Sequence, residues 1–155
     1  MYIGDSAERH PDTIACVIDD GIASLTYAEL DARSNALAHA LGALGLGPGD
    51  TLAVILENRI EYAVCWWAAM RSGMYVTPIN WHLTEGEVRY IVVNCGAKAV
   101  VTSPSTADAI AGALTEVPGL RHIQVGAADA GSTGVLDFDS LLAEYPTSRI
   151  AAELA

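Results

Sequence analysis

Basic residues are scarce in this sequence. It has 155 residues, with 19 acidic residues against 8 basic ones, so the formal net charge is −11, and Lys98 is the single lysine. Proteins that bind nucleic acid or an anionic membrane surface use clusters of lysine and arginine, and no such cluster occurs here. We therefore expect neither partner. A phosphate-bearing ligand would depend on backbone amides, on scattered arginines, or on another part of the protein.

Cysteine is also scarce, and its spacing excludes the common cysteine sites. Cys16, Cys65 and Cys95 fit none of the CxxC spacings that hold zinc or a redox disulfide, and none has an adjacent His or Lys to stabilise a thiolate. We expect reduced, mostly buried thiols. The histidines lack metal-ligand spacing as well. They are His10, His39, His82 and His122.

Long apolar runs are absent. No run of 18 apolar residues occurs, and the best candidate, residues 63–70, is flanked by Glu61 and Arg71. Residues 1–10 contain no apolar core of a signal peptide. The sequence therefore predicts a soluble, cytoplasmic protein, and its 52% apolar content is enough for the core of one globular domain.

Apolar strands alternate with capped helices along most of the chain. The strands are predicted at 51–56, 75–79, 98–102 and 121–125. A period of roughly 23 residues is typical of βαβ units with right-handed crossovers. The predicted fold class is therefore α/β, with a largely parallel sheet flanked by helices. The helix caps are expected at Asn58 with Glu61, Thr84 with Glu87, and Ser105 with Asp108.

A hairpin and a long helix precede these units. Residues 13–18 and 22–25 are predicted to pair through an Asp-Asp-Gly turn at 19–21. Thr26 and Glu29 form a capping box that starts a helix. The helix is predicted to pack by one face. Its apolar stripe is predicted to be Leu30, Leu37, Leu41 and Leu44, with Arg33 and Asn35 off that stripe.

The chain is expected to divide into four parts. A last helix is predicted from Asp137 or Asp139 to Ala143, and Pro146 ends it. The final residues have no helix terminator, which resembles a cut more than a natural end. The predicted parts are a flexible lead at 1–10, an α/β core at 11–125, a loop at 126–136, and a terminal helix with a cut end at 137–155.

Residues 73–84 are where a ligand is first expected. Gly73 can take the left-handed conformation that closes a helix, residues 75–77 favour a strand, and Pro78 ends it because it lacks an amide proton. The following residues lie at the carboxyl end of that strand, where ligands bind in open α/β sheets. The alternative is a Trp that packs across the sheet edge beside a solvated His. These following residues are Asn80, Trp81 and His82.

Three other stretches resemble ligand sites less closely. Residues 42–47 match neither GxGxxG nor a Walker loop and are interpreted as a helix end and a turn. Residues 131–134 could form part of a phosphate-binding nest, or a flexible surface loop. Trp66 and Trp67, beside Tyr62, are predicted to pack in an aromatic core rather than to stack on a cofactor.

Taken together, several segments resemble the amino-terminal part of the acyl-CoA synthetases, or fatty-acid CoA ligases, of the adenylate-forming (AMP-binding) superfamily. No segment is specific alone, but their order and spacing resemble the family from about Pro11 to Thr102. The segments are residues 25–30 with Asn35 and Ala38, residues 44–50, Glu57-Asn58 with Glu61, Gly73 with residues 78–84, and Glu87-Val88 with Tyr90-Ile91 and Lys98.

The resemblance implies an enzyme that uses ATP and Mg²⁺ to convert a carboxylic acid to an acyl-adenylate. Pyrophosphate is released, and the acyl group is then transferred to the thiol of coenzyme A. The fold it implies is the amino-terminal portion of the large domain of such an enzyme.

The family's catalytic segments do not occur in the 155 residues. They are a Ser/Thr/Gly-rich phosphate loop ending in Pro-Lys-Gly, an aromatic-Thr-Glu segment, an Asp that holds the ribose, a hinge Arg, and a Lys in a mobile lid. The resemblance therefore implies a fragment with no catalytic residue and no adenylation activity. ATP, Mg²⁺ and the acid are expected to bind through a downstream region.

Trp81 and His82 are the site residues that the resemblance carries over. In related CoA ligases the position after Asn80-Trp81 is often basic and lies near the mouth where the CoA nucleotide enters. The resemblance therefore implies a contact between His82 and a CoA phosphate, with Trp81 beside it. A histidine there is a weaker, pH-dependent cation than an arginine.

Two other interpretations stay open at this point. One is a stand-alone, non-catalytic α/β module for partner binding or dimerisation. The other is a flavodoxin-like nucleotide-binding protein, although the first βα turn carries no phosphate-binding sequence. Fold analogy alone does not choose among them. An incomplete sheet would expose an edge or an apolar patch, so a homodimer or other self-association is expected.

Overall fold

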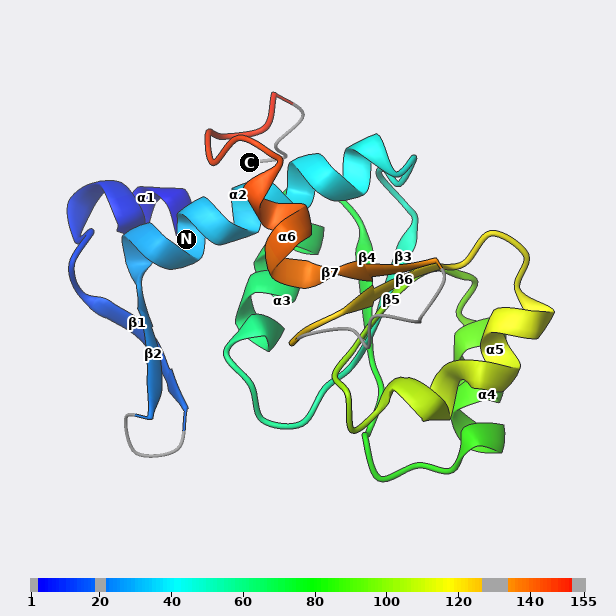
Figure 1. Ribbon diagram of the computed structural model, residues 1–155. Helices are drawn as coiled ribbons and strands as arrows, with labels where there is room; N and C mark the ends of the chain where they lie inside the picture. Colours follow the sequence, from blue (N-terminus) through cyan, green and yellow to red (C-terminus); the bar gives the residue numbers. More distant parts are fainter. Residues whose placement is uncertain (1–2, 19–21, 127–133, 152–155) are drawn as a thin grey trace.

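A computed structural model describes residues 3–18, 22–126 and 134–151 (Figure 1). Helices and strands alternate through most of this range. In chain order the elements are α1 Ile3–Arg9, β1 Ile14–Ile18, β2 Ala23–Thr26, α2 Tyr27–Ala43, β3 Thr51–Ile55, α3 Glu61–Arg71, β4 Tyr75–Pro78, α4 Glu85–Asn94, β5 Ala97–Thr102, the 3₁₀ helix η2 Ala107–Ile110, α5 Ala111–Glu116, β6 Arg121–Gln124, β7 Val135–Asp137 and α6 Phe138–Ala143.

The main sheet has five parallel strands in the order β4-β3-β5-β6-β7. All five residues of β3 are buried, as expected for a parallel strand covered on both faces. β4 lies at one edge, where Pro78 ends it without removing a central hydrogen bond. Gly73 takes a positive φ of 67° just before this strand. The predicted α/β class and parallel sheet are confirmed.

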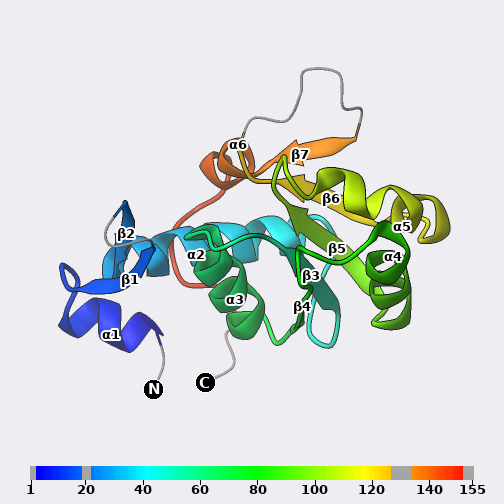
Figure 2. The same cartoon turned by 90° about the horizontal axis from the view of Figure 1, so that it is seen from below.

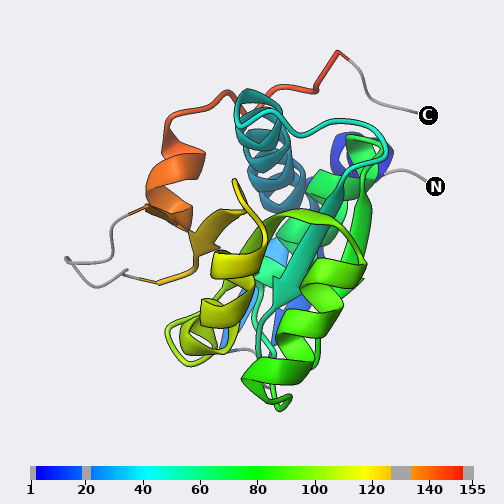
Figure 3. The same ribbon diagram turned by 90° about the vertical axis from the view of Figure 1, so that its right-hand side faces the viewer.

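Helices cover both faces of the sheet (Figure 3). One face packs against α2, α3 and α6 through residues such as Leu37, Val64 and Phe138. The opposite face packs against α4 and the η2–α5 segment through Val88 and Ile110. The sheet therefore separates two apolar cores.

The hairpin of β1 and β2 stands apart from the five-stranded sheet, beside α1 and the start of α2 (Figure 2). Its strands pair antiparallel as predicted, and the predicted turn at 19–21 lies outside the described residues. Thr26 accepts a hydrogen bond from the Glu29 amide, and the Glu29 carboxylate accepts one from the Thr26 amide at 2.8 Å. The predicted capping box is confirmed.

Two predicted irregular segments contain regular structure. Residues 1–10, predicted to be a flexible lead, contain α1, which packs on α2 and buries Ile3. Residues 126–136, predicted to be a loop, include the start of β7, which pairs parallel with β6. Most of the candidate nest at 131–134 lies outside the described residues.

The α2 helix is buried on more than one face, contrary to the prediction. It contacts α1, α3 and α6. Asn35, predicted to lie off the apolar stripe, is 1% exposed. It accepts a hydrogen bond from Arg71 of α3 and donates one to Asp31. A polar residue is buried here because a cation on the neighbouring helix needs acceptors.

Two predicted helix caps are wrong. The α3 helix begins after Ile60, which is the N-cap residue in place of Asn58 and gives no side-chain cap, and the Glu61 carboxylate binds the Arg59 guanidinium at 3.3 Å. The Ser105 hydroxyl lies 2.8 Å from the Ser103 hydroxyl instead of capping a helix. The other predicted caps, Thr84 before α4 and Asp137 before α6, are confirmed.

The cysteines are free thiols, as predicted. Cys65 is fully buried, and burial raises its pKa. Burial also raises the pKa of Cys16, which is half-buried. Both thiols therefore stay protonated and unreactive near neutral pH. No helix within the described ranges is long and apolar enough to cross a membrane.

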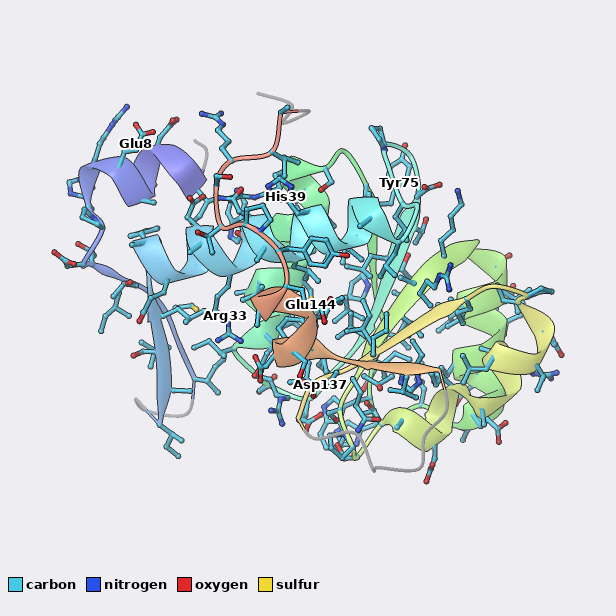
Figure 4. All side chains as sticks on the ribbon, turned by 45° about the horizontal axis from the view of Figure 1, so that its top comes forward. Glu8, Arg33, His39, Tyr75, Asp137 and Glu144 are labelled. Carbon is cyan, nitrogen blue, oxygen red and sulfur yellow. The ribbon has the colours of Figure 1, made fainter. Side chains whose placement is uncertain are left out.

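The segment after α6 runs back along α2 (Figure 4). There the His39 Nε2 lies 2.9 Å from the carbonyl oxygen of Ser148. Asp137 is the N-cap of α6, and its side chain accepts a hydrogen bond from the Ser140 amide at 2.8 Å. These contacts fix the last described elements against the body of the domain.

Candidate functional site

The carboxyl ends of β3, β4 and β5 lie at one edge of the sheet, because the three strands are parallel. From β3 the chain goes first to β4 on one side and then crosses to β5 on the other side. The strand order therefore reverses between β3 and β5. In open α/β sheets this switch point forms the crevice where ligands bind. We call this edge, residues 56–59, 79–83 and 103–106, the carboxyl edge.

The turn after β4 brings Trp81 and His82 together. Their ring centroids are 3.6 Å apart, with an angle of 32° between the ring planes. The Asn80 side chain fixes the turn by accepting a hydrogen bond from the His82 amide at 3.0 Å. Both rings are exposed, with Trp81 44% exposed. The pair forms an exposed aromatic platform at the carboxyl edge.

The helix after this turn begins with a capping box and acidic side chains. The Glu87 carboxylate accepts hydrogen bonds from the amide and the hydroxyl of Thr84, at 2.9 and 2.7 Å. These bonds hold the pKa of Glu87 below its usual value. Glu85 adds a second carboxylate to the first turn of α4. The two carboxylates disfavour an anionic ligand on the α4 side of this turn, and the imidazole of His82 lies on the other side.

A polar network joins the ends of β3 and β5. The Ser103 hydroxyl donates to the Glu57 carboxylate at 2.6 Å, across 46 residues of sequence. The Ser103 amide donates to the Thr106 hydroxyl at 2.9 Å, and this hydroxyl donates to the Ile55 carbonyl at 2.8 Å. The network ties the two strands together where the strand order reverses.

Glu57 stays ionised within this network. Burial alone would raise its pKa, but the hydrogen bonds from Ser103 and from the backbone and the positive charge of Arg59 outweigh that effect, so the pKa lies below its usual value. Arg59 lies 3.5 Å from Glu57 and 3.3 Å from Glu61. Glu57 therefore acts as a hydrogen-bond acceptor and is not poised as a general acid.

The carboxyl edge carries an exposed aromatic pair and an ionised carboxylate in a hydrogen-bonded network, and these groups can position a ligand. Among the residues that the structure describes, no group of three or more His, Cys, Asp and Glu side chains could hold a metal ion. Lys98 lies on β5, where its Nζ is 2.6 Å from Asp50, the residue before β3. That ion pair is at the amino ends of the strands, away from the carboxyl edge.

Sequence reasoning found part of this site. It placed Trp81 and His82 at the carboxyl end of a strand, and the structure places them there. It missed the bond between Glu57 and Ser103, although both residues directly follow predicted parallel strands and could have been paired on that ground. Trp66 was predicted to pack in the core, but it is 41% exposed; Trp67 and Tyr62 do pack against the core.

Comparisons with known proteins agree on one family. The model of the AMP-binding enzyme family matches residues 3–151. A medium/long-chain-fatty-acid–CoA/3-oxocholest-4-en-26-oate–CoA ligase of Mycobacterium marinum is 32% identical, over 99% of this chain and 29% of its own length. The long-chain fatty acid transport protein 1 of Rattus norvegicus is also 32% identical, over 94% of this chain and 23% of its own length.

A solved structure confirms the fold. The crystal structure of an anthranilate CoA ligase in complex with anthranoyl-AMP matches 97% of this chain and 29% of its own, with a TM-score of 0.87 and 20% sequence identity. The chain thus spans less than a third of the length of each of these three proteins. By its sequence and its fold, this chain belongs to the AMP-binding enzyme family.

Proposed function

We propose that this chain is the amino-terminal structural part of an ATP-dependent fatty-acid CoA ligase. Such an enzyme activates a carboxylic acid with ATP and Mg²⁺ to an acyl-adenylate and then transfers the acyl group to coenzyme A. The observation that carries the proposal is the 32% identity to a fatty-acid CoA ligase over 99% of this chain.

The chain alone is proposed to be inactive in adenylation. Stabilising the charge that develops on a phosphoryl group requires cations or metal ions placed beside it. The single lysine of the sequence, Lys98, is held by Asp50 at the amino ends of the strands. No Pro-Lys-Gly segment occurs in the sequence. The groups that bind ATP, Mg²⁺ and the acid would therefore belong to another part of the enzyme.

The role of the chain in the reaction is proposed to be a contact with coenzyme A. Trp81 and His82 form an exposed aromatic pair at the carboxyl edge. An indole face can stack on the adenine ring, and an imidazolium can attract a phosphate. The two carboxylates of the α4 first turn would repel the same phosphate, which restricts the contact to the His82 side.

Pyrophosphate exchange tests the proposed inactivity of the chain in adenylation. With ATP, Mg²⁺ and a panel of fatty acids, the 155-residue chain should give no acid-dependent exchange, while the M. marinum ligase provides the positive control. Exchange by the purified chain above the level without acid would contradict the proposed inactivity.

His82→Ala tests the CoA contact in an enzyme that contains this chain. We expect a several-fold higher KM for CoA and unchanged acid-dependent pyrophosphate exchange, because exchange does not involve CoA. His10→Ala, an exposed histidine next to α1, is the matched control and should change neither value. An unchanged KM for CoA in His82→Ala would remove this residue from the site.

A further inference from the structure

Two apolar elements face each other across an open groove. The groove lies between the β1–β2 hairpin and α3 (Figure 2), and it has a volume of about 420 Å³. Cys16 and Ile18 of the hairpin and Trp66 of α3 line it. Among the described residues of its lining, Arg59 is the single charged side chain. The groove therefore offers mainly apolar surface.

The α3 helix has no charged face toward solvent. A helix at a protein surface normally carries charged or polar side chains on its outer face, and a helix that is apolar all round is normally buried. Trp66 and Met70, one turn apart, are the two exposed residues of α3, at 41% and 50%. Its charged residues contribute little to the surface, because Arg71 is fully buried and the side chain of Glu61 is 12% exposed. The sequence of α3 is thus that of a covered helix.

The α4 helix provides a comparison within the same molecule. It covers the opposite face of the sheet and exposes Glu85, Glu87 and Arg89, together with apolar residues such as Val93. Its outer face therefore has the charged side chains that are expected of a helix in contact with water, and α3 does not.

The hairpin has the same apolar character as α3. Its strand β1 is a continuous apolar run, which is typical of a strand covered on both faces. All five residues of β3 are buried, but none of the five in β1 is. Successive side chains of a strand point to opposite faces, so Val17, which is 48% exposed, faces away from the groove that Cys16 and Ile18 line. Both faces of the hairpin are therefore apolar and open.

This surface is too wide for a small molecule, and it disfavours a second copy of the chain. Val17 and Met70 lie outside the groove lining, so a ligand that filled the groove would leave both exposed. A second copy carries the same net charge of −11, and this repulsion opposes association. In contrast, the M. marinum ligase matches this chain over 29% of its own length, so more than two-thirds of that enzyme lies outside the matching residues.

We propose that the hairpin, the groove and the outer face of α3 together form the surface against which the downstream part of the ligase docks. The occupant is a segment of the same polypeptide with an apolar face, and it covers Val17, Trp66 and Met70. Removal of this apolar area from water drives the docking. The inference rests on the proposed function, because only a longer ligase supplies such a segment.

Cysteine accessibility in the longer ligase tests this docking surface. Met70→Cys places a thiol on the outer face of α3, and Val93→Cys places one on α4, where the wild-type residue has a similar exposure of 43%. Each variant is treated with iodoacetamide, and peptide mass spectrometry follows alkylation at the introduced residue. We expect the thiol at position 70 to react on the order of tenfold more slowly than the thiol at position 93, because the docked segment must open before the reagent enters.

An introduced charge provides a second measurement on the same two positions. Met70→Asp should lower the Tm of the longer ligase by several degrees, because docking would bury an unpaired carboxylate. Val93→Asp is the matched control and should leave the Tm nearly unchanged. Both positions are the last but one of their helices, so the unfavourable interaction of an acidic side chain with the helix dipole is the same in the two variants.

The outcomes distinguish this inference from the proposed function. Equal alkylation rates, or equal effects of the two Asp variants, in a ligase that is active in pyrophosphate exchange would overturn the docking surface and leave the proposed function intact. Protection of position 70 that is lost when the ligase is diluted would show that a second copy covers the surface, and would overturn the inference as well. A reading frame that ends at Ala155 would overturn both, because no downstream segment would exist.

Discussion

The side chain of Arg71 is fully buried between α2 and α3. Its guanidinium donates to Asp31 at 2.7 Å and to Asn35, and Asn35 donates to Asp31 at 3.1 Å. Burial lowers the pKa of Arg71, and the Asp31 carboxylate opposes this shift. A buried cation that loses its anionic partner keeps the full free-energy cost of desolvation. Separating α2 from α3 would therefore be costly, and we expect this network to hold the two helices in one relative position.

Asp31→Ala should therefore lower the free energy of unfolding by about 3 kcal/mol or more, measured by urea denaturation. Asp139→Ala is the matched control, because the ion pair of Asp139 with Arg33 is at the surface, with 68% of the Asp139 side chain exposed. Its cost should stay below about 1 kcal/mol. Equal costs for the two variants would show that the Arg71 network does not stabilise the fold.

His122 of β6 is a second buried polar side chain, 6% exposed. Its Nε2 lies 2.7 Å from the Thr102 hydroxyl of β5, and its Nδ1 has no hydrogen-bond partner among the described residues. Burial lowers the pKa of His122. The unfolded chain therefore binds a proton at this residue more readily than the folded chain does.

Stability should depend on pH through His122. Burial lowers the pKa of His122 in the folded chain from an ordinary value of about 6.5. The contribution of the neutral imidazole to the free energy of unfolding is therefore fully present above about pH 6.5 and is lost as the pH falls below that value. His122→Gln should flatten the dependence of the unfolding free energy between about pH 7 and about pH 5. The exposed His10→Gln should not. A wild-type slope in His122→Gln would refute this assignment.

At the scale of elements, the capping box between Thr26 and Glu29 fixes where α2 begins. Its hydrogen bonds hold the pKa of Glu29 below the usual value. The same residues join β2 to α2, so the cap also sets how the hairpin meets the rest of the fold. Because the motif is local, it could be recognised from the sequence alone.

Thr26→Ala should cost about 1 kcal/mol of unfolding free energy, because it leaves an amide of the first turn without its acceptor. Ser24→Ala, an exposed residue of β2, is the control and should change stability by no more than about 0.5 kcal/mol. Thermal and urea denaturation both measure the difference. If the two variants were equally stable, the capping box would not contribute.

The elements that could be predicted are those specified by neighbouring residues. The continuous apolar run of β3, the edge position of β4 ended by Pro78, and the capping box of α2 all follow from local patterns. The predicted caps at Asn58 and Ser105 are wrong because nearby side chains form other contacts, Glu61 with Arg59 and Ser105 with Ser103. Ser103, which binds Ser105, also binds Glu57, and this bond becomes visible only when β3 and β5 lie side by side.

The same limit applies to the candidate site. Trp81 and His82 could be placed from the strand that precedes them. The burial of Asn35 and the exposure of Trp66 could not, because the first depends on Arg71 of another helix and the second on the groove beside the hairpin. The spacing of apolar residues within one helix does not show which polar or apolar groups the neighbouring elements place against it.

The described chain forms a parallel five-stranded sheet with helices on both faces, the fold of the AMP-binding enzyme family. It spans 29% of the length of a fatty-acid CoA ligase that it matches along almost its entire length. We propose that the exposed pair of Trp81 and His82 is the ligand contact that this unit supplies. We propose that this unit is part of a longer acyl-CoA ligase.

The most direct test is the coding sequence beyond the codon of Ala155, determined together with the intact mass of the protein produced from it. We predict that the reading frame continues into a Ser/Thr/Gly-rich segment that ends in Pro-Lys-Gly. A stop codon directly after Ala155, with an intact mass that agrees with it, would contradict membership of a longer ligase. The chain would then be a non-catalytic α/β module, and its binding partner would replace the acid substrate as the object of study.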